Sequence, residues 1–284
     1  MTRQQKYVAG RTLFYLMLLV IAVYLVFPFY WALRSSVTPD NQLFSTPVQY
    51  WPTNPTTGNY QLVLTNGNFL RALANSTVVA VSVTLLSLAI GVLGSYALGR
   101  FRFPGRLPVM YLILSMTMFP AIAVLGALFE RISSFGLYNQ LPALIITYLI
   151  FTLPFTVWVL TSFFQQMPKD LEEAAYVDGC SPLQTLYLVM LPLVAPGLVT
   201  TGLLAFIGAW NEFLFALSFI QTPDKQTVTL ALVNFATTTA GGFEIPWGQI
   251  QAATVIVTIP LIVLTLIFQR RIVLAALSAG AAKG

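Results

Sequence analysis

Residues 172–193 read "EEAAYVDGCSPLQTLYLVMLPL" and lie between two long apolar stretches. This short segment holds three carboxylates, a glycine and two prolines, although the whole chain is 57% hydrophobic and only 8% charged. Because soluble domains carry roughly 25% charged residues, the composition predicts a protein that lies in a lipid bilayer. The segment 172–193 is then expected to lie at the surface of the bilayer.

The composition also excludes several functions. The chain of 284 residues has no histidine and a single cysteine, Cys180. This removes the commonest general base and metal ligand, and it leaves Cys180 without a disulfide partner. The net charge is +5, but the basic residues lie at the ends of apolar runs, which favours membrane anchoring over nucleic-acid binding. We therefore expect a non-catalytic membrane protein that itself binds no metal, cofactor or nucleic acid.

Six stretches are apolar and long enough to cross a bilayer, which takes about 20 residues. They cover residues 12–33, 72–99, 107–129, 141–164, 196–220 and 249–268. The first stretch is too long for a signal peptide and no small-residue cleavage site follows it, so we expect it to be retained. The expected fold class is all-α, a polytopic membrane protein whose six transmembrane helices occupy residues 12–269.

The distribution of basic residues predicts the orientation. With the N-terminus in the cytoplasm, ten of the 14 Lys and Arg residues fall on the cytoplasmic side and four on the outer side, as the positive-inside rule requires. Residues 1–11 and 270–284 are then cytoplasmic, as is the loop 168–192 between the fourth and fifth spans. The outer loops 35–71 and 221–248 are rich in Pro, Gly, Thr and Asn and are expected to be irregular.

Local patterns in the loop 168–192 predict a short helix that ends in a tight turn. Asp170 is expected to cap this helix, and Glu172 and Glu173 fall in its first turn, where the helix dipole favours carboxylates. Asp178 and Gly179 end the helix, because glycine supplies the left-handed residue that commonly follows one.

A second helix is predicted to follow the turn. Ser181 and Pro182 suit its N-cap and first position, and it is expected to end near Leu191 and Pro192. These residues alone leave two interpretations open. One is an amphipathic connector lying on the membrane, and the other is a small element that fits a groove on another protein.

A longer pattern favours the second interpretation. "EAAYVDG", nine residues and then "VMLP" resemble the EAA loop of permeases of ATP-binding-cassette (ABC) importers, with Val189 in place of the usual Ile. Asn75–Thr77 ("NST"), Gly99–Gly105 ("GRFRFPG") and Trp210–Leu217 ("WNEFLFAL") further resemble the carbohydrate subfamily, typified by the shorter permease of the maltose transporter. The resemblance covers nearly the whole chain and is weakest in the outer loops.

The resemblance implies that the loop is a coupling helix, which docks in a cleft of a cytoplasmic ATPase. Its coupling residues would be Glu172, Glu173, Ala174, Ala175, Asp178, Gly179, Leu191 and Pro192. The resemblance also implies partners: a second, different permease subunit, two ATPase subunits that hold ATP and Mg, an extracytoplasmic solute-binding protein and membrane lipid. The chain would take up a sugar or oligosaccharide across the cytoplasmic membrane of a bacterium or archaeon.

Polar residues in the spans suggest a substrate path. Asn75, Trp210, Asn211 and Glu212 combine an aromatic face, amides and a carboxylate, as sugar sites do. The alternative is that they form hydrogen bonds between helices.

Three further groups of residues have proposed roles. An outer stretch is expected to reach the binding protein, unless it is a plain solvated loop: Ala240, Gly241, Gly242 and Phe243. Gly91, Ser95 and Gly99 recur every four residues and predict close helix packing. Arg100, Arg102 and Arg106 suggest an orientation signal and headgroup contacts, with an ATPase contact as a minor alternative.

Two other functions remain as alternatives. One is an ABC permease for a different solute, such as a glycerophosphodiester or an oligopeptide. The other is an ion-coupled carrier, which needs buried titratable groups; Glu212 is nearly alone in that respect, and the EAA pattern is then unexplained.

Overall fold

A computed structural model of the chain describes residues 3–238 and 245–281. Within those residues the chain forms helices and connecting loops, with no strand. The helices are α1 (Arg3–Ser36), α2 (Asp40–Leu43), α3 (Gly58–Thr65), α4 (Gly67–Arg100), α5 (Arg106–Met116), α6 (Ala121–Ser134), α7 (Leu141–Gln166), α8 (Asp170–Val177), α9 (Pro182–Gln184), α10 (Leu191–Trp210), α11 (Leu214–Phe219), α12 (Val228–Thr238) and α13 (Trp247–Ala281). The expected all-α fold class is confirmed.

Five helical segments of the described chain are long and apolar enough to cross a membrane. They are Gly10–Ser36, Gly67–Arg100, Leu141–Gln166, Pro182–Trp210 and Trp247–Gln269. A sixth span exists if α5 and α6 together count as one. The structure therefore supports a multi-pass membrane protein of five to six spans.

The third expected span, 107–129, is not one straight helix. It consists of α5 and α6, which are bent by 93° at the break between them. The cause lies in Pro120, since a proline disfavours the helical conformation of the residue before it. Pro120 itself is the N-cap of α6, with φ −68° and ψ 126°. The apolar run predicted the length of this region but not its bend.

The fifth expected span, 196–220, begins and ends elsewhere. A continuous helical segment runs from Pro182 to Trp210, so no helix ends at Leu191 and Pro192. The chain crosses Pro192 because a π-helical stretch, Thr185–Met190, lies directly before α10. A proline ring clashes with the carbonyl four residues earlier in an α-helix, and the wider π turn relieves this crowding. At the other end α10 stops at Trp210, and α11 starts separately at Leu214.

The two loops predicted to lie outside contain more helix than expected. Residues 35–71 include α2, α3 and the start of α4, and residues 221–248 include a short 3₁₀ helix, Pro223–Lys225, and α12. Because these loops are rich in polar residues, the sequence interpretation missed helix α12, whose first residues include the buried Val228 and Leu230. The segment 270–284, expected to be a tail, begins as a continuation of α13.

Backbone contacts divide the chain into two compact units, Met1–Gly67 with Leu232–Ile259, and Asn68–Ala231 with Pro260–Gly284. In the first unit, polar side chains join the end of α1 to the short helices. Asn59 of α3 donates hydrogen bonds to the carbonyl oxygens of Ser36 (3.0 Å) and Thr38 (3.2 Å). The amide of Gly248, at the start of α13, donates to Asp40 Oδ1 at 3.1 Å.

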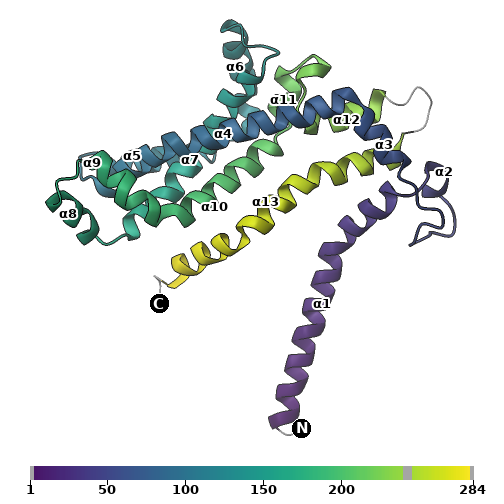
Figure 1. The fold of residues 1–284 in the computed structure, drawn as a ribbon, viewed down its shortest axis with the longest axis horizontal. Helices are drawn as coiled ribbons and strands as arrows, with labels where there is room; N and C mark the ends of the chain where they lie inside the picture. Colours follow the sequence, from purple (N-terminus) through teal and green to yellow (C-terminus); the bar gives the residue numbers. More distant parts are fainter. Residues whose placement is uncertain (1–2, 239–244, 282–284) are drawn as a thin grey trace. The chain divides into compact units, whose positions relative to one another are not determined.

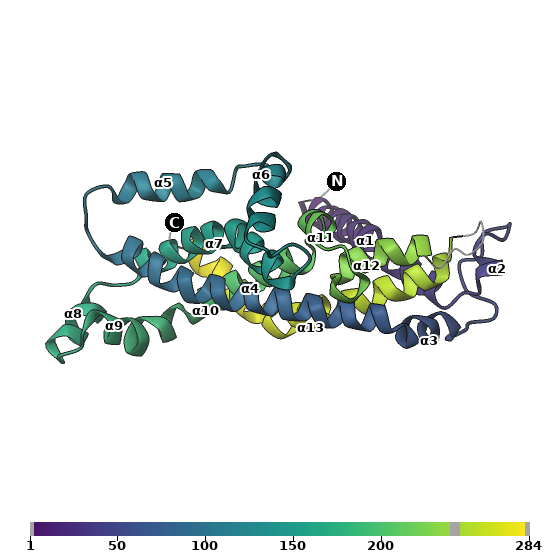
Figure 2. The same cartoon turned by 90° about the horizontal axis from the view of Figure 1, so that it is seen from above.

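The second unit is built around α4, α7 and α10, which run side by side, with α8 and α9 beyond their ends (Figure 1). Seen from above, α5 runs alongside α7, and α6 leaves the end of α5 at a steep angle (Figure 2). Glycines bring α4 onto α7: a Cβ at Gly91 would lie 2.8 Å from Thr156 Cγ2, and one at Gly99 would lie 2.7 Å from Phe164 Cβ. Ser95 is fully buried between them. The packing interpretation of these three small residues is confirmed.

We predict that Gly99→Ala lowers stability by about 1–3 kcal/mol, the usual cost of overpacking a filled core. The added methyl meets Phe164 Cβ, which cannot move without moving the backbone of α7. Gly94→Ala on the same helix is the control, because its Cβ would lie 3.7 Å from Val157 Cγ2, an ordinary contact. Thermal unfolding of the purified protein in detergent measures the difference, and equal midpoints for the two variants would show that α4 and α7 are not closely packed at Gly99.

Candidate functional site

The first candidate site is the helix–turn–helix that follows α7. Helix α7 ends at Gln166 because Pro168 holds Met167 in an extended conformation, with φ −74° and ψ 138°. After Pro168 and Lys169, helix α8 begins at Asp170. Asp170 is therefore the first helical residue and not the cap: the N-cap is Lys169, which makes no side-chain capping hydrogen bond.

The turn after α8 forms as the sequence predicts. Gly179 has φ +81°, a conformation that costs glycine little and a β-branched residue much. The amide of Cys180 donates to the carbonyl of Ala175 (2.9 Å) and the amide of Gly179 to that of Tyr176 (3.1 Å). These two bonds are the Schellman motif, which satisfies the last carbonyls of a helix.

The second helix also begins as predicted. Ser181 is its N-cap and Pro182 its first residue. Ser181 Oγ accepts from the amide of Gln184 (3.4 Å), and Gln184 Oε1 accepts from the amide of Ser181 (2.8 Å). This is a reciprocal capping box. The turn and both of its helix ends are therefore fixed by hydrogen bonds within the segment itself.

The structure separates the eight predicted coupling residues into two groups. Five of them are exposed: Glu173, Ala174, Asp178, Gly179 and Pro192. The others face the chain's own interior. Ala175 is 5% exposed, Leu191 packs against a buried apolar cluster, and Glu172 is turned toward Arg100. Val177, which the sequence interpretation did not single out, is 87% exposed.

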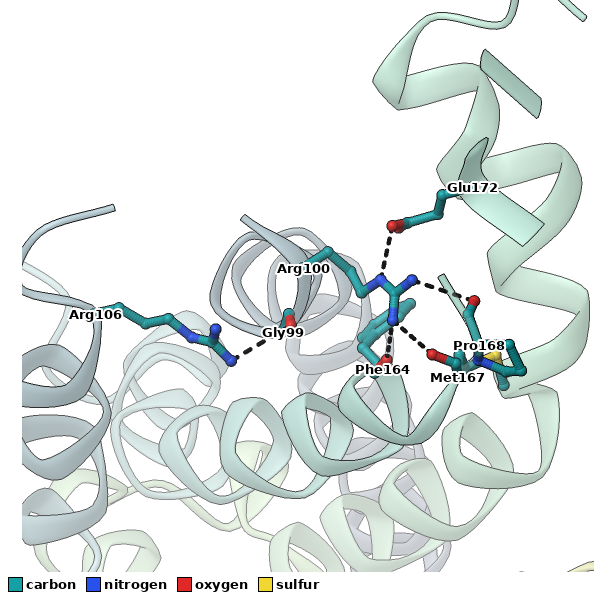
Figure 3. Close-up of polar contacts among 7 residues, drawn as sticks. All are labelled: Gly99, Arg100, Arg106, Phe164, Met167, Pro168 and Glu172. Carbon is teal, nitrogen blue, oxygen red and sulfur yellow. Dashed lines mark hydrogen bonds and ion pairs between the residues drawn. The ribbon is translucent and has the colours of Figure 1, made fainter. Parts of the chain in front are cut away.

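Arg100, the last residue of α4, holds Glu172 (Figure 3). Arg100 Nε lies 2.8 Å from Glu172 Oε2, and the two side chains are only 5% and 12% exposed. The guanidinium also donates to three carbonyl oxygens at the end of α7 and just after it. Nη1 donates to Phe164 (3.1 Å) and Met167 (2.8 Å), and Nη2 donates to Pro168 (3.3 Å). This arginine was expected to serve as an orientation signal, and its contacts with α7 and α8 were missed.

Beneath this ion pair, one apolar cluster joins the same helices. It consists of Val92, Tyr96, Leu160, Phe164, Leu186, Met190 and Val194. These residues come from α4, α7, the π-helical stretch and α10. Helix α8 itself contacts the π-helical stretch. The ends of three long helices that lie nearest the helix–turn–helix therefore share one core with it.

The second candidate site is a cavity of about 400 Å³ within the second unit. It is lined by Ala121, Tyr148, Phe151, Thr152, Phe155, Leu204, Ala205, Gly208, Ala209, Glu212 and Phe215. Aromatic rings dominate this lining, and Phe151 and Phe215 stack with their centroids 5.2 Å apart. Tyr148 is 2% exposed, and its hydroxyl is buried without a hydrogen-bond partner. A mostly apolar pocket with few polar groups is typical of a small-molecule site.

Only one of the four predicted substrate-path residues lines this cavity. Glu212 was expected inside a span, but it lies in the gap between α10 and α11. Its carboxylate accepts from the amides of Phe215 (2.9 Å) and Ala216 (3.2 Å), which are otherwise unpaired amides at the start of α11. Glu212 therefore caps a helix and lines the cavity at the same time.

The other three predicted residues lie elsewhere. Trp210 is buried and stacks on Phe206 at 5.5 Å, and Asn211 is exposed. Asn75 donates to the carbonyls of Asp224 (2.9 Å) and Gln226 (3.0 Å), so it holds the loop that precedes α12. For Asn75 the alternative, a structural hydrogen-bonding role, fits the geometry. The predicted contact segment Ala240, Gly241, Gly242 and Phe243 lies outside the described residues.

Residues 88–275 match the family described as "Binding-protein-dependent transport system inner membrane component". The chain is 42% identical over 269 residues to the trehalose/maltose transport system permease protein MalG of Thermococcus litoralis, with 94% of each chain covered. It is 38% identical over 265 residues to the trehalose transport system permease protein SugB of Mycobacterium tuberculosis, with 93% of this chain and 95% of that protein covered.

The fold is also similar to that of a solved structure. A crystal structure of a bacterial ABC transporter involved in the import of the acidic polysaccharide alginate contains a chain that matches with a TM-score of 0.80. The match covers 95% of this chain and 98% of that chain at 23% sequence identity. At this identity the similarity concerns the fold.

We predict that Glu212→Ala lowers the free energy of unfolding by about 1–2 kcal/mol, the upper range for loss of a helix cap. The amides of Phe215 and Ala216 then lose their acceptor. The neighbouring exposed residue provides the control, and Asn211→Ala should change little. Thermal unfolding in detergent compares the two variants, and an unchanged midpoint for Glu212→Ala would contradict the capping role.

Proposed function

Because the chain belongs to the family of binding-protein-dependent transport system inner membrane components, we propose that it is the permease subunit of a sugar importer driven by a separate ATPase. Relatives named as trehalose and maltose permeases, aligned over nearly the full chain, support a sugar or oligosaccharide as the solute. They favour it over the alternative solutes, a glycerophosphodiester or an oligopeptide. Family membership also removes the reason for considering an ion-coupled carrier.

The observation that carries the coupling role is the exposed face of α8. Glu173, Ala174 and Val177 are exposed, and their spacing places them on one side of the helix. Ala174 allows close approach, Val177 offers apolar area, and Glu173 offers a carboxylate for charge-assisted hydrogen bonds. This combination suits a cleft on a protein.

The acidic character of α8 argues against the alternative of a helix that lies on lipid. Helices of that kind carry Lys and Arg on their polar face, and the anionic inner leaflet attracts basic segments. Helix α8, "DLEEAAYV", has three acidic residues in its first turn and no basic residue in its last turn. We therefore assign its exposed face to an ATPase subunit that binds ATP and Mg.

The remaining assembly follows from this assignment. The excess of basic residues on one side favours cytoplasmic N- and C-termini, which brings α8 to the cytoplasmic surface, where an ATPase docks. The full importer would contain this chain, a different second permease, two ATPase subunits and an extracytoplasmic binding protein. The segment Ala240–Phe243 stays a candidate contact with that binding protein.

We propose the cavity around Tyr148 and Glu212 as the part of the substrate path that this chain contributes. Sugars offer apolar C–H faces and many hydroxyls, which suit stacked rings flanked by a few polar atoms. The hydroxyl of Tyr148 supports this assignment, because a buried polar group without a partner is costly and a sugar hydroxyl supplies one. Phe151, Phe155 and Phe215 replace Asn75, Trp210 and Asn211 as the candidate neighbours of Glu212.

We predict that Gly179→Val prevents ATP hydrolysis from driving uptake, because valine cannot adopt φ +81° without strain. The turn that orients α8 would then be distorted. Gly179→Asn is the matched control, since asparagine tolerates the left-handed conformation, and it should transport at close to the normal rate. Uptake and ATP hydrolysis of the reconstituted importer are measured together, and near-normal uptake by Gly179→Val rejects the proposal.

We predict that Tyr148→Phe weakens direct binding of trehalose or maltose to the purified importer by about threefold to tenfold, the loss of one hydrogen bond. Tyr96→Phe is the matched control. The Tyr96 hydroxyl is also buried without a partner, but Tyr96 lies in the apolar cluster that contains Phe164 and does not line the cavity. Retention of labelled sugar by the importer is measured for both variants. Equal retention by Tyr148→Phe and wild type would remove Tyr148 from the substrate path.

A further inference from the structure

We infer that Arg100 is a positioning residue that makes α8 move together with α4 and α7, so that it sets how much of an ATPase-driven displacement reaches the membrane helices. This inference rests on the proposed function, in which an ATPase moves α8. The residues at the exposed face of α8 receive the displacement, whereas Arg100 lies behind that face and touches neither partner nor substrate in the proposed mechanism.

One guanidinium joins three helical elements. Arg100 belongs to α4, its carbonyl acceptors lie at the end of α7 and in the linker that follows, and its carboxylate partner lies in the first turn of α8. No other ion pair is found within the described residues. The same side chain thus fixes the end of one helix and the beginning of the next (Figure 3).

Arg100 also holds the linker between α7 and α8. Only Met167, Pro168 and Lys169 separate α7 from α8, and a short non-helical linker is where a hinge is expected to absorb changes of φ and ψ. Arg100 binds the carbonyls of two of these three residues, Met167 and Pro168. With these bonds in place, rotation of α8 about the linker requires breaking charge-assisted hydrogen bonds in a buried site.

The end of α4, to which Arg100 belongs, is packed tightly against α7. The neighbouring Gly99 lies so close to Phe164 that a Cβ would approach to 2.7 Å, so the end of α4 packs directly on the end of α7. Arg106 adds a bond from Nη2 to the carbonyl of Gly99 at 3.4 Å (Figure 3). A displacement of α8 that pulls on Arg100 therefore acts on α4 and α7 as a pair.

The chemistry of arginine suits this position. Its planar fork offers five donors, and four donor–acceptor contacts are made here, one to the carboxylate and three to carbonyls. Lysine presents a compact point charge with three donors and does not reproduce that spread. Removing either partner leaves the other charge buried without compensation, which is costly.

The test uses the complete importer, reconstituted with its ATPase, second permease and binding protein, and compares Arg100→Gln, Arg100→Lys and Glu172→Gln. Arg102→Gln is the matched control: it removes the same charge from an exposed position two residues further on. The readouts are the amount of ATPase retained on purification, the thermal midpoint, and the number of sugars taken up per ATP hydrolysed.

We expect Arg100→Gln to retain the ATPase and to hydrolyse ATP, while sugar uptake per ATP falls about tenfold, within the range typical of coupling between two sites. Arg100→Lys and Glu172→Gln should be intermediate, and Arg102→Gln should match wild type. The double variant Arg100→Gln/Glu172→Gln should be no worse than Arg100→Gln alone, because the two residues act through one contact.

Two outcomes would overturn the inference. One is unchanged uptake per ATP in Glu172→Gln and Arg100→Lys, even if Arg100→Gln lowers the thermal midpoint, because a purely structural cap changes stability and not coupling. The other is an equal loss in Arg102→Gln, which would assign the effect to general charge. A wild-type complex that retains no ATPase would instead overturn the proposed function, so the two failures are distinguishable.

Discussion

In hydrocarbon, a backbone amide or carbonyl without a partner has no water to replace the lost hydrogen bond. This constraint explains where the chain interrupts its helices and how each interruption is stabilised. In the gap after α10, the carboxylate of Glu212 accepts hydrogen bonds from two amides of α11. At the end of α7 and just after it, Arg100 donates hydrogen bonds to three carbonyl oxygens. The chain at Pro192 avoids an interruption by adopting π turns.

The same constraint connects the charged residues to the mechanism we propose. Charged side chains are costly within a bilayer, and Arg100 and Glu212 each stabilise a helix end where the backbone changes direction. Beside Arg100, α7 ends and a linker of three residues leads into α8. Glu212 lies in the gap between α10 and α11 and lines a cavity that also contains aromatic rings. In the mechanism we propose, one of these charged residues lies in the coupling region and the other in the substrate path, and each also stabilises a helix end.

Much of the fold follows from local rules that act over a few residues. The apolar stretches predicted the spans, Gly179 predicted the turn, and Ser181 with Pro182 predicted the next helix start, because each depends on neighbours in the sequence. The sequence interpretation missed the bend at Pro120 and wrongly ended a helix near Pro192. A proline can end a helix, bend it or lie within it, and packing decides which. Arg100 contacts Phe164 and Glu172, which lie 64 or more residues away in the chain, and the cavity around Tyr148 is lined by several separate helices. No local pattern specifies these contacts.

Helix α8 is joined to the membrane helices by two chain connections of different stiffness. On the C-terminal side, after the turn at Gly179, an unbroken helical segment leads from Pro182 to Trp210. On the N-terminal side, a linker of three residues leads back to α7. A continuous helix transmits a displacement in either direction along its axis, whereas a non-helical linker transmits one only when it is stretched. In the mechanism we propose, the contacts of Arg100 with the linker and with Glu172 stiffen the N-terminal connection, so that both connections transmit the same displacement.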